Sequence, residues 1–137
     1  MSARPILVVE DCEEDFQTVL DAARHAGLAH PIVRAGSGGE CLRLLRGAVR
    51  DRALLVLLDL NTPGDDGRDA LRNIRSDDSL RTLPLVVLSA SANPLDLQFC
   101  YAQGANAYHV KPVDHAQHLQ MLLSIFAYWL GPVALPL

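Results

Sequence analysis

The sequence predicts an α/β domain, a single doubly wound sheet of five parallel strands with helices on both faces. Short apolar runs alternate with helical patterns five times along 137 residues, which is the length of one domain. The run 53–58 contains no polar residue, which is typical of a strand buried on both faces at the centre of a parallel sheet. Because β–α–β crossovers are right-handed, such a repeat places helices on both faces.

The strands are predicted from apolar runs, and the first two helices from periodicity and end signals. The strand runs are 6–9, 31–35, 53–58, 84–88 and 107–110. Apolar residues at helical spacing over 16–26 predict the first helix, and Gly27 ends it. Ser37 and Glu40 have the S-x-x-E spacing of a capping box, so we expect the second helix to begin here.

The other three helices are predicted in the same way. The inner face of the third is marked by Ala70, Leu71 and Ile74. Asn93 and Pro94 are typical of the N-cap and first position of a fourth helix, which Gly104 closes. Asp114 is expected to cap the last helix, which runs to about Tyr128.

The composition excludes several classes of protein. With 12 basic against 16 acidic residues the net charge is −4, so we expect no nucleic-acid binding, which needs a basic face. No apolar run approaches the ~20 residues that span a bilayer, and the N-terminus lacks a signal-peptide pattern, so we expect a cytoplasmic protein without membrane contact. The cysteines Cys12, Cys41 and Cys100 form no C-x-x-C pair and predict reduced thiols.

Charged and polar residues follow four of the five predicted strands. Glu10 and Asp11 come after the first strand, Asp59 after the third, Ser89 after the fourth and Lys111 after the fifth. Lys111 is the single lysine in a chain whose other basic residues are all arginine. Because the carboxyl ends of parallel strands share one edge of a sheet, where ligands bind, we expect these side chains to converge.

This set of side chains predicts phosphoryl chemistry. Clustered carboxylates repel one another, and a hard divalent ion such as Mg²⁺ relieves the repulsion. The expected Mg²⁺ ligands are Glu10, Asp11, Asp59 and the backbone carbonyl of Asn61. A carboxylate such as Asp59 can accept a phosphoryl group as an acyl phosphate. Lys111 and the Ser89 hydroxyl would then hold the phosphoryl oxygens.

The same residues lie in short motifs that occur in order at the strand ends. They are Val-Glu10-Asp11, Leu-Asp59-Leu-Asn-Thr-Pro63 with Gly67, Leu-Ser89-Ala, and Tyr108-His-Val-Lys111-Pro112. Over nearly its full length the chain thereby resembles the receiver domain of bacterial two-component response regulators. The resemblance implies a flavodoxin-like fold with strand order 2-1-3-4-5 and Mg²⁺-dependent phosphorylation of Asp59 by a sensor histidine kinase. It implies no enzyme activity beyond the protein's own phosphorylation and dephosphorylation.

The resemblance also implies roles for other positions. Ser89 is the expected switch hydroxyl, Tyr108 the aromatic side chain that moves with it, and the bond before Pro112 is expected to be cis. Three residues depart from the family pattern. Ser89 stands where Thr is commoner, a change that should preserve the mechanism. Cys12 follows the acidic pair where Asn or Asp is usual, and Ser91 lies two positions beyond the switch hydroxyl.

The C-terminal segment resembles the tail of the small single-domain regulators that pair with phytochrome histidine kinases. We therefore expect a receiver domain over 1–127 and an apolar tail over 128–137 that acts as a dimerisation arm, without room for a DNA-binding output domain. The last helix is apolar nearly all round, which favours a partner surface. The expected homodimer, in one form with exchanged tails, uses Phe126, Trp129 and Leu130.

Two alternatives stay open at this level. Asp59-Leu-Asn61-Thr62 loosely matches the D-x-D-x-T motif of aspartate-nucleophile phosphatases of the haloacid-dehalogenase kind, although Asn61 stands where those enzymes need a second Asp. A flavodoxin-like scaffold that only dimerises is the other alternative, but it has no use for the charge cluster. The histidines lack metal-ligand spacing. His109 is expected on the last strand, and the other four, His118 among them, on the surface of helices or loops.

Overall fold

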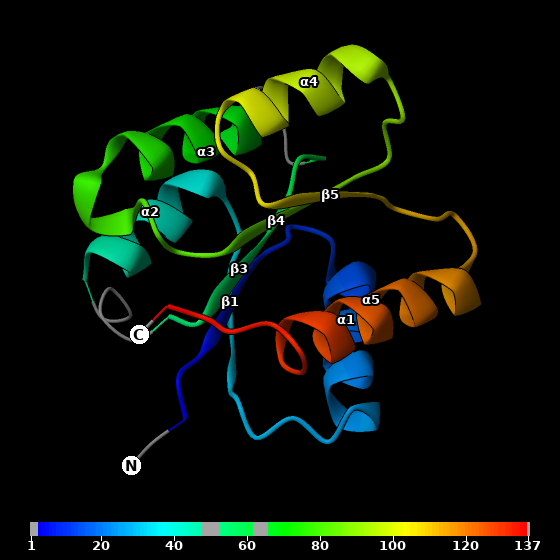
Figure 1. The fold of residues 1–137 in the computed structure, drawn as a ribbon. Coiled ribbons are helices and arrows are strands. Elements are labelled where there is room, and N and C mark those ends of the chain that lie inside the picture. The colour runs from blue at the N-terminus through cyan, green and yellow to red at the C-terminus, as the bar shows by residue number, and fades with distance from the viewer. Residues whose placement is uncertain (1–2, 48–52, 62–65, 137) are drawn as a thin grey trace.

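The computed structural model describes residues 3–47, 53–61 and 66–136 (Figure 1). Its strands are β1 (Ile6–Val9), β2 (Ile32–Ala35), β3 (Leu55–Asp59), β4 (Leu85–Ser89) and β5 (Ala107–Val110). Its helices are α1 (Glu13–His25), α2 (Gly38–Arg46), α3 (Asp66–Ser76), α4 (Pro94–Ala102) and α5 (His115–Trp129), with a short 3₁₀ helix, η1 (Asp78–Leu80). The predicted succession of five β–α repeats is confirmed.

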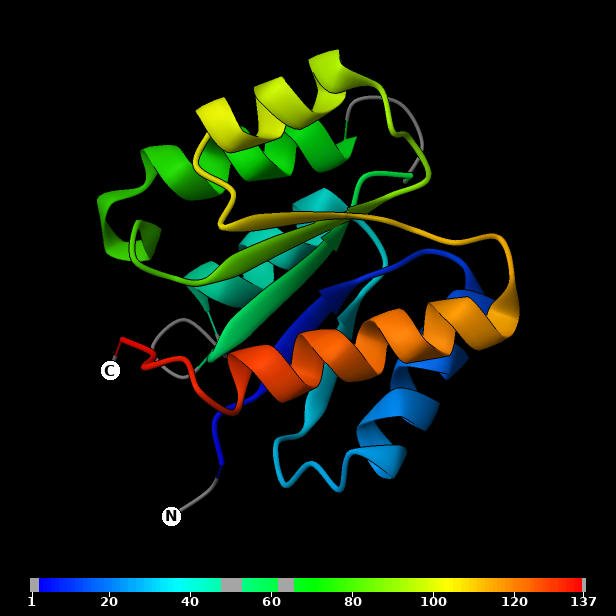
Figure 2. The same ribbon diagram turned by 45° about the vertical axis from the view of Figure 1, so that its right-hand side comes forward.

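The strands form one parallel sheet in the order β2-β1-β3-β4-β5. Helices α1 and α5 cover one face of the sheet, and α2, α3 and α4 cover the other (Figure 1, Figure 2). Both the predicted strand order and the predicted placement of helices on two faces are therefore confirmed. The carboxyl ends of all the strands lie at the same edge, which is where the candidate site forms.

Strand β3 is the buried centre of the sheet, as its unbroken apolar run predicts. All five of its residues are buried. Val56 and Leu58 pack into the core under α2 and α3, while Leu55 and Leu57 pack into the core under α1 and α5. Burying a leucine side chain contributes about 2 kcal/mol. Asp59 thus ends a strand that packing holds on both sides.

Side-chain caps begin three of the helices where the sequence predicts them. The Ser37 hydroxyl accepts from the Glu40 amide at 3.1 Å, Asn93 caps α4 ahead of Pro94, and Asp114 caps α5. Helix α1 begins at Glu13, three residues before the expected range. Its first turn consists of acidic residues, which the positive end of the helix dipole stabilises.

The end of α5 packs against its own chain, which corrects one part of the predicted dimer contact. Phe126 is 1% exposed in the core that α1 and α5 form over the sheet, so it has no surface to offer a partner. Trp129 and Leu130 are partly buried against the same core. The guanidinium of Arg4 donates to the carbonyl oxygen of Pro136 at 3.1 Å, and this bond ties the tail to the start of the chain.

The three cysteines are free thiols, of which Cys41 and Cys100 are buried and Cys12 is exposed. Among the residues described, no helix has the length and apolar character needed to cross a membrane.

Candidate functional site

Four strands deliver the site residues to one edge of the sheet. Glu10 follows β1, Asp59 ends β3, Ser89 ends β4 and Lys111 follows β5. Glu10 is 3% exposed, Asp59 1% and Ser89 3%, so these polar groups are nearly enclosed by protein. The convergence expected from the strand ends is therefore present for these four residues.

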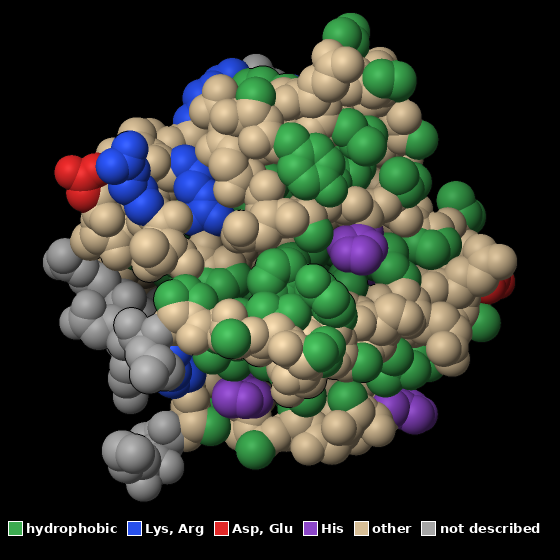
Figure 3. Space-filling view, viewed as in Figure 1, with side chains coloured by type: hydrophobic (Ala, Val, Ile, Leu, Met, Phe, Trp, Pro, Cys, Tyr) green, Lys and Arg blue, Asp and Glu red, His purple; other side chains and the backbone are tan. Residues whose placement is uncertain are grey.

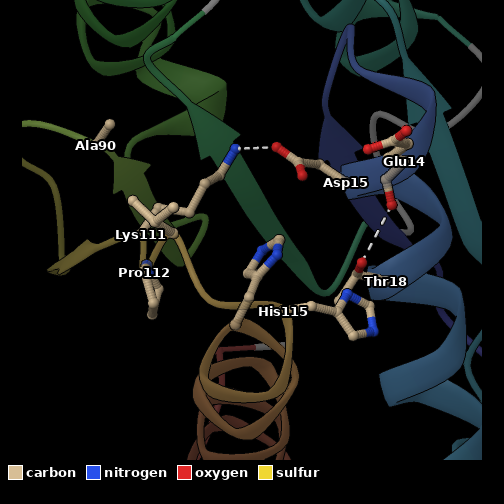
Figure 4. Close-up of a pocket in the computed structure, with 9 residues that line it drawn as sticks. Glu14, Asp15, Thr18, Ala90, Lys111, Pro112 and His115 are labelled. Carbon is tan, nitrogen blue, oxygen red and sulfur yellow. Dashed lines mark hydrogen bonds and ion pairs between the residues drawn. The ribbon is translucent and has the colours of Figure 1, made fainter.

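The ammonium group of Lys111 lies among three carboxylates. Its Nζ donates to Oδ2 of Asp59 at 2.5 Å, to Oδ2 of Asp15 at 2.7 Å and to Oε1 of Glu10 at 3.3 Å. Figure 4 shows the side chain reaching from the end of β5 toward Asp15 on α1. Burial lowers the pKa of Lys111, but its hydrogen bonds to Asp15 and Asp59 and the negative charges of Asp59 and Glu10 together raise it more, so the pKa stands above its ordinary value.

The Glu10 carboxyl is electrostatically strained by the same enclosure. Its pKa is raised to about 8, first by burial and further by the neighbouring Asp59, while Lys111 and the Cys12 amide act in the opposite direction. A carboxylate oxygen of Glu10 accepts from the Cys12 amide at 3.3 Å. One cation of the protein thus does not fully satisfy the acidic cluster, and a second positive charge would stabilise it.

The carboxylates fit a divalent metal ion. Within the described chain, oxygens of Glu10, Asp15 and Asp59 lie within 4.8 Å of one another, which makes this a possible three-carboxylate metal site. Hard ions such as Mg²⁺ take carboxylate oxygens in partly hydrated sites of this kind. Asp11 is exposed and stands outside this group. Its expected role as a ligand therefore stays a prediction.

Asp15 is a site residue that the sequence analysis missed. It lies in the first turn of α1, where a run of acidic residues reads as favourable charge at a helix N-terminus. The signal that could have found it is position: the first turn after β1 lies at the ligand-binding edge of the sheet.

Each oxygen of Asp59 has a donor. Oδ1 accepts from the backbone amide of Asn61 at 2.8 Å, and Oδ2 accepts from Lys111. The Asn61 side-chain oxygen accepts from the Ala90 amide at 3.3 Å, so this residue links two strand-end loops. An amide in this position cannot act as the acid/base carboxyl of a phosphatase.

The residues expected to switch are joined through the loop after β4. The Ser89 hydroxyl accepts from the Ser91 amide at 3.1 Å, and the Tyr108 hydroxyl donates to the Ser91 carbonyl at 2.7 Å. Tyr108 is partly buried and packs against the core. The expected cis bond before Pro112 is not present: all peptide bonds of the described chain are trans. Lys111 reaches the carboxylates from a trans bond, which is the lower-energy form for X–Pro.

A pocket of about 530 Å³ adjoins Lys111 between α1 and the start of α5 (Figure 4). Its lining includes Asp15, Thr18, His115 and His118. The prediction that His118 lies at the surface is wrong, since it is 4% exposed. The cause is the position of His118 on the side of α5 that faces α1. Burial there lowers the pKa of its imidazole.

Comparison with known proteins assigns the chain to a family. The model of the response regulator receiver domain matches residues 6–123. Response regulator Rcp1 from Synechocystis sp. is 32% identical over 135 residues, which cover 96% of this chain and 92% of Rcp1. Because the match includes the strand ends that carry the site, the phosphatase alternative is not favoured.

Solved structures agree with this assignment. The phosphorylated cyanobacterial phytochrome response regulator RcpA has a TM-score of 0.90 and 34% identity, over 98% of this chain and 99% of that one. The Mn²⁺-bound form of Rcp1 has a TM-score of 0.89 and 31% identity, over 98% of this chain and 99% of that one. Fold, site geometry and sequence agree, and the chain belongs to the response regulator receiver domain family.

Proposed function

We propose that this receiver domain accepts a phosphoryl group on Asp59 from a sensor histidine kinase. The observation that carries the proposal is the Lys111 ammonium 2.5 Å from Oδ2 of Asp59, inside an enclosed acidic cluster. An oxygen of Asp59 forms the new bond to phosphorus as the bond between phosphorus and the kinase's histidine nitrogen breaks. Lys111 offsets the negative charge that the phosphoryl group brings.

We assign Mg²⁺ to the same cluster. Glu10, Asp15 and Asp59 are the carboxylates close enough together to hold it. Asp11 and the backbone carbonyl of Asn61 are proposed as further ligands, from the receiver motif. When bound, the ion supplies positive charge to the phosphoryl oxygens and lets them approach the carboxylates.

Ser89 and Tyr108 are the proposed switch. The Ser89 hydroxyl would donate to a phosphoryl oxygen, and the Tyr108 ring would follow the loop to which its own hydroxyl is bonded. The resulting surface change would be read by another protein. Large apolar side chains are exposed nearby on α4 and β5, at Leu95, Tyr101 and Val110. Figure 3 shows hydrophobic side chains gathered over this part of the molecule.

The proposed kinase is of the phytochrome type. The support is the likeness to RcpA and Rcp1 over nearly the whole chain. A phosphotransfer profile against the sensor kinases of the same cell tests this assignment. A phytochrome kinase should label the protein fastest, and preferential labelling by an unrelated kinase would contradict the pairing.

We also propose a homodimer through α5 and the tail over 128–137. Tyr128 supports it, being 57% exposed while its ring meets Trp129 edge-on at 5.4 Å. Sedimentation velocity of Tyr128→Ser and of a chain ending at Leu130 tests the contact. Both should shift toward monomer, whereas an unchanged dimer would exclude the tail. The shortened chain keeps Trp129 and Leu130, which pack against the protomer's own core.

Asp59→Asn tests the phosphorylation itself. The variant should lose Mg²⁺-dependent, hydroxylamine-sensitive phosphate after incubation with a phosphorylated kinase. The matched control is Asp69→Asn, which changes an exposed carboxylate on α3 away from the cluster. Full labelling of Asp59→Asn would refute the assignment of the phospho-acceptor.

A further inference from the structure

Ser91 organises the loop between β4 and α4 through hydrogen bonds of both its backbone and its side chain. Its amide donates to the Ser89 hydroxyl at 3.1 Å, and its carbonyl accepts from the Tyr108 hydroxyl at 2.7 Å. Its own hydroxyl donates to Oδ2 of Asp96 and accepts from the Asn93 amide. Ser91 is therefore hydrogen-bonded to both proposed switch residues.

Asp96 connects this loop to α3. Its other carboxylate oxygen, Oδ1, accepts from the guanidinium of Arg68, and the two side chains are 24% and 30% exposed. The Arg68 guanidinium also lies 4.7 Å from the centre of the Phe99 ring on α4. A partly shielded pair with a cation–π contact holds its geometry better than an isolated surface ion pair.

The start of helix α4 is weakly packed. Of its nine residues only Cys100 is buried, and Leu95 on its first turn is 71% exposed. Apolar packing therefore gives the start of α4 little restraint, and the polar contacts of Asp96 hold the helix start and the preceding loop in place.

The hydrogen bonds of Ser89 indicate which state this arrangement favours. A hydroxyl group has one proton and two lone pairs. Because the Ser91 amide donates to the Ser89 oxygen, the Ser89 proton stays available for an acceptor such as a phosphoryl oxygen on Asp59. Tyr108 is at the same time packed inward and bonded to Ser91.

We propose that Arg68 and Asp96 are positioning residues for the switch, which act through Ser91 to hold Ser89 and Tyr108 ready for the phosphorylated state. We call Arg68, Asp96 and Ser91 the Ser91 clamp. The inference rests on the proposed function, since it requires a phosphoryl group on Asp59. Arg68 and Asp96 touch neither Asp59 nor Lys111 among the contacts of the described residues.

Beryllofluoride with Mg²⁺, a phosphoryl analogue, tests the clamp by calorimetric titration. Ser91→Ala and Asp96→Ala should each weaken beryllofluoride binding about fivefold. The effect is modest because a hydrogen bond shifts the equilibrium only by the difference in its strength between the free and the bound protein. The double variant should be little weaker than either single one, since both remove the same link. Ser91→Thr keeps the hydroxyl and should restore binding.

The matched control is Asp69→Ala, which removes another Arg–Asp pair of α3, the one with Arg72 at 2.8 Å. It should bind beryllofluoride like the wild type. Asp96→Ala should also shift the Ser89 and Tyr108 amide resonances of the unliganded protein, and Asp69→Ala should not.

Each other result overturns the clamp in a distinguishable way. Wild-type affinity in Asp96→Ala would remove the clamp and leave the proposed function intact. If Ser91→Ala and Asp96→Ala weaken binding, Ser91→Thr does not restore it, and thermal stability falls to the same extent, the hydrogen bond supports the fold and does not position the switch. Absence of beryllofluoride binding in the wild type would refute the proposed function, and the inference with it.

Discussion

The Nζ atom of Lys111 lies 2.5 Å from Oδ2 of Asp59, although 52 residues separate the two in the sequence. The lysine side chain is 9% exposed and also meets Asp15 and Glu10. Its hydrogen bonds keep its pKa above the ordinary value despite burial. The site therefore carries a positive charge at neutral pH, adjacent to the proposed phospho-acceptor.

Lys111→Arg should keep this charge and still impair switching. A compact ammonium can approach three carboxylates from one point, whereas the planar guanidinium fork cannot. We expect beryllofluoride binding to weaken about tenfold or more, the equivalent of one charge-assisted hydrogen bond. Arg72→Lys, an exchange of the same kind at an exposed position, is the control. A fully competent Lys111→Arg protein would contradict the prediction.

Mg²⁺ binding should release protons from Glu10. Its pKa, raised to about 8 mainly by burial, leaves the carboxyl largely protonated at pH 7, and a metal ion must displace that proton. Binding should therefore tighten as pH rises toward 8. Calorimetry at pH 7 in buffers of different ionisation enthalpy measures the released protons, and Glu10→Gln should abolish the release. Equal heats in all buffers for the wild type would disprove it.

The same shift predicts how the metal-free protein responds to pH. Because the folded-state pKa of Glu10 is raised, its contribution to stability is complete below pH 4.5 and is lost as pH rises through about 8. In EDTA, the thermal midpoint of the wild type should fall over this range relative to Glu10→Gln. Mg²⁺ should remove most of the difference. If the thermal midpoints of the wild type and Glu10→Gln change with pH in parallel, Glu10 is not the titrating group.

His118 should destabilise the protein in acid. Burial lowers its pKa from the ordinary 6.5, so its contribution is present above pH 6.5 and is lost as pH falls through the folded-state pKa. The charged groups around it include Asp15, which opposes the shift, and Lys111 and His115, which add to it. His118→Gln should flatten the acid limb of urea-unfolding curves. His115→Gln, an exposed change one turn earlier, should alter the acid limb much less, because His115 only adds to a shift that burial causes.

Gly67→Ala should destabilise the fold next to Asp59. The added Cβ would lie 3.1 Å from Cα of Leu60 and 3.3 Å from the Asp59 carbonyl oxygen, so backbone would have to move. Overpacking of this kind costs about 1–3 kcal/mol of unfolding free energy. Gly36→Ala is the control, because its Cβ would meet nothing within 4 Å. Equal urea midpoints for the two variants would contradict the prediction.

Much of this protein follows from its sequence alone. The unbroken apolar run before Asp59 predicted a central parallel strand, and β3 is buried along its whole length. Once the strands were parallel, their carboxyl ends had to share an edge, which brought Glu10, Ser89 and Lys111 to Asp59. Strand patterns report such placements reliably, because side chains alternate with a period of two and the strand direction fixes which end is which.

The tertiary structure alone decided which helical side chains join the site and which join the core. Asp15 faces Lys111 while Asp11 stays exposed, Phe126 is enclosed in its own protomer, and His118 is buried against α1. Helical periodicity gives the relative directions of side chains on one helix, but not how the helix is rotated against the sheet. That rotation is set by packing between α1 and α5, which are distant in sequence, and it makes the acidic start of α1 part of the candidate metal site.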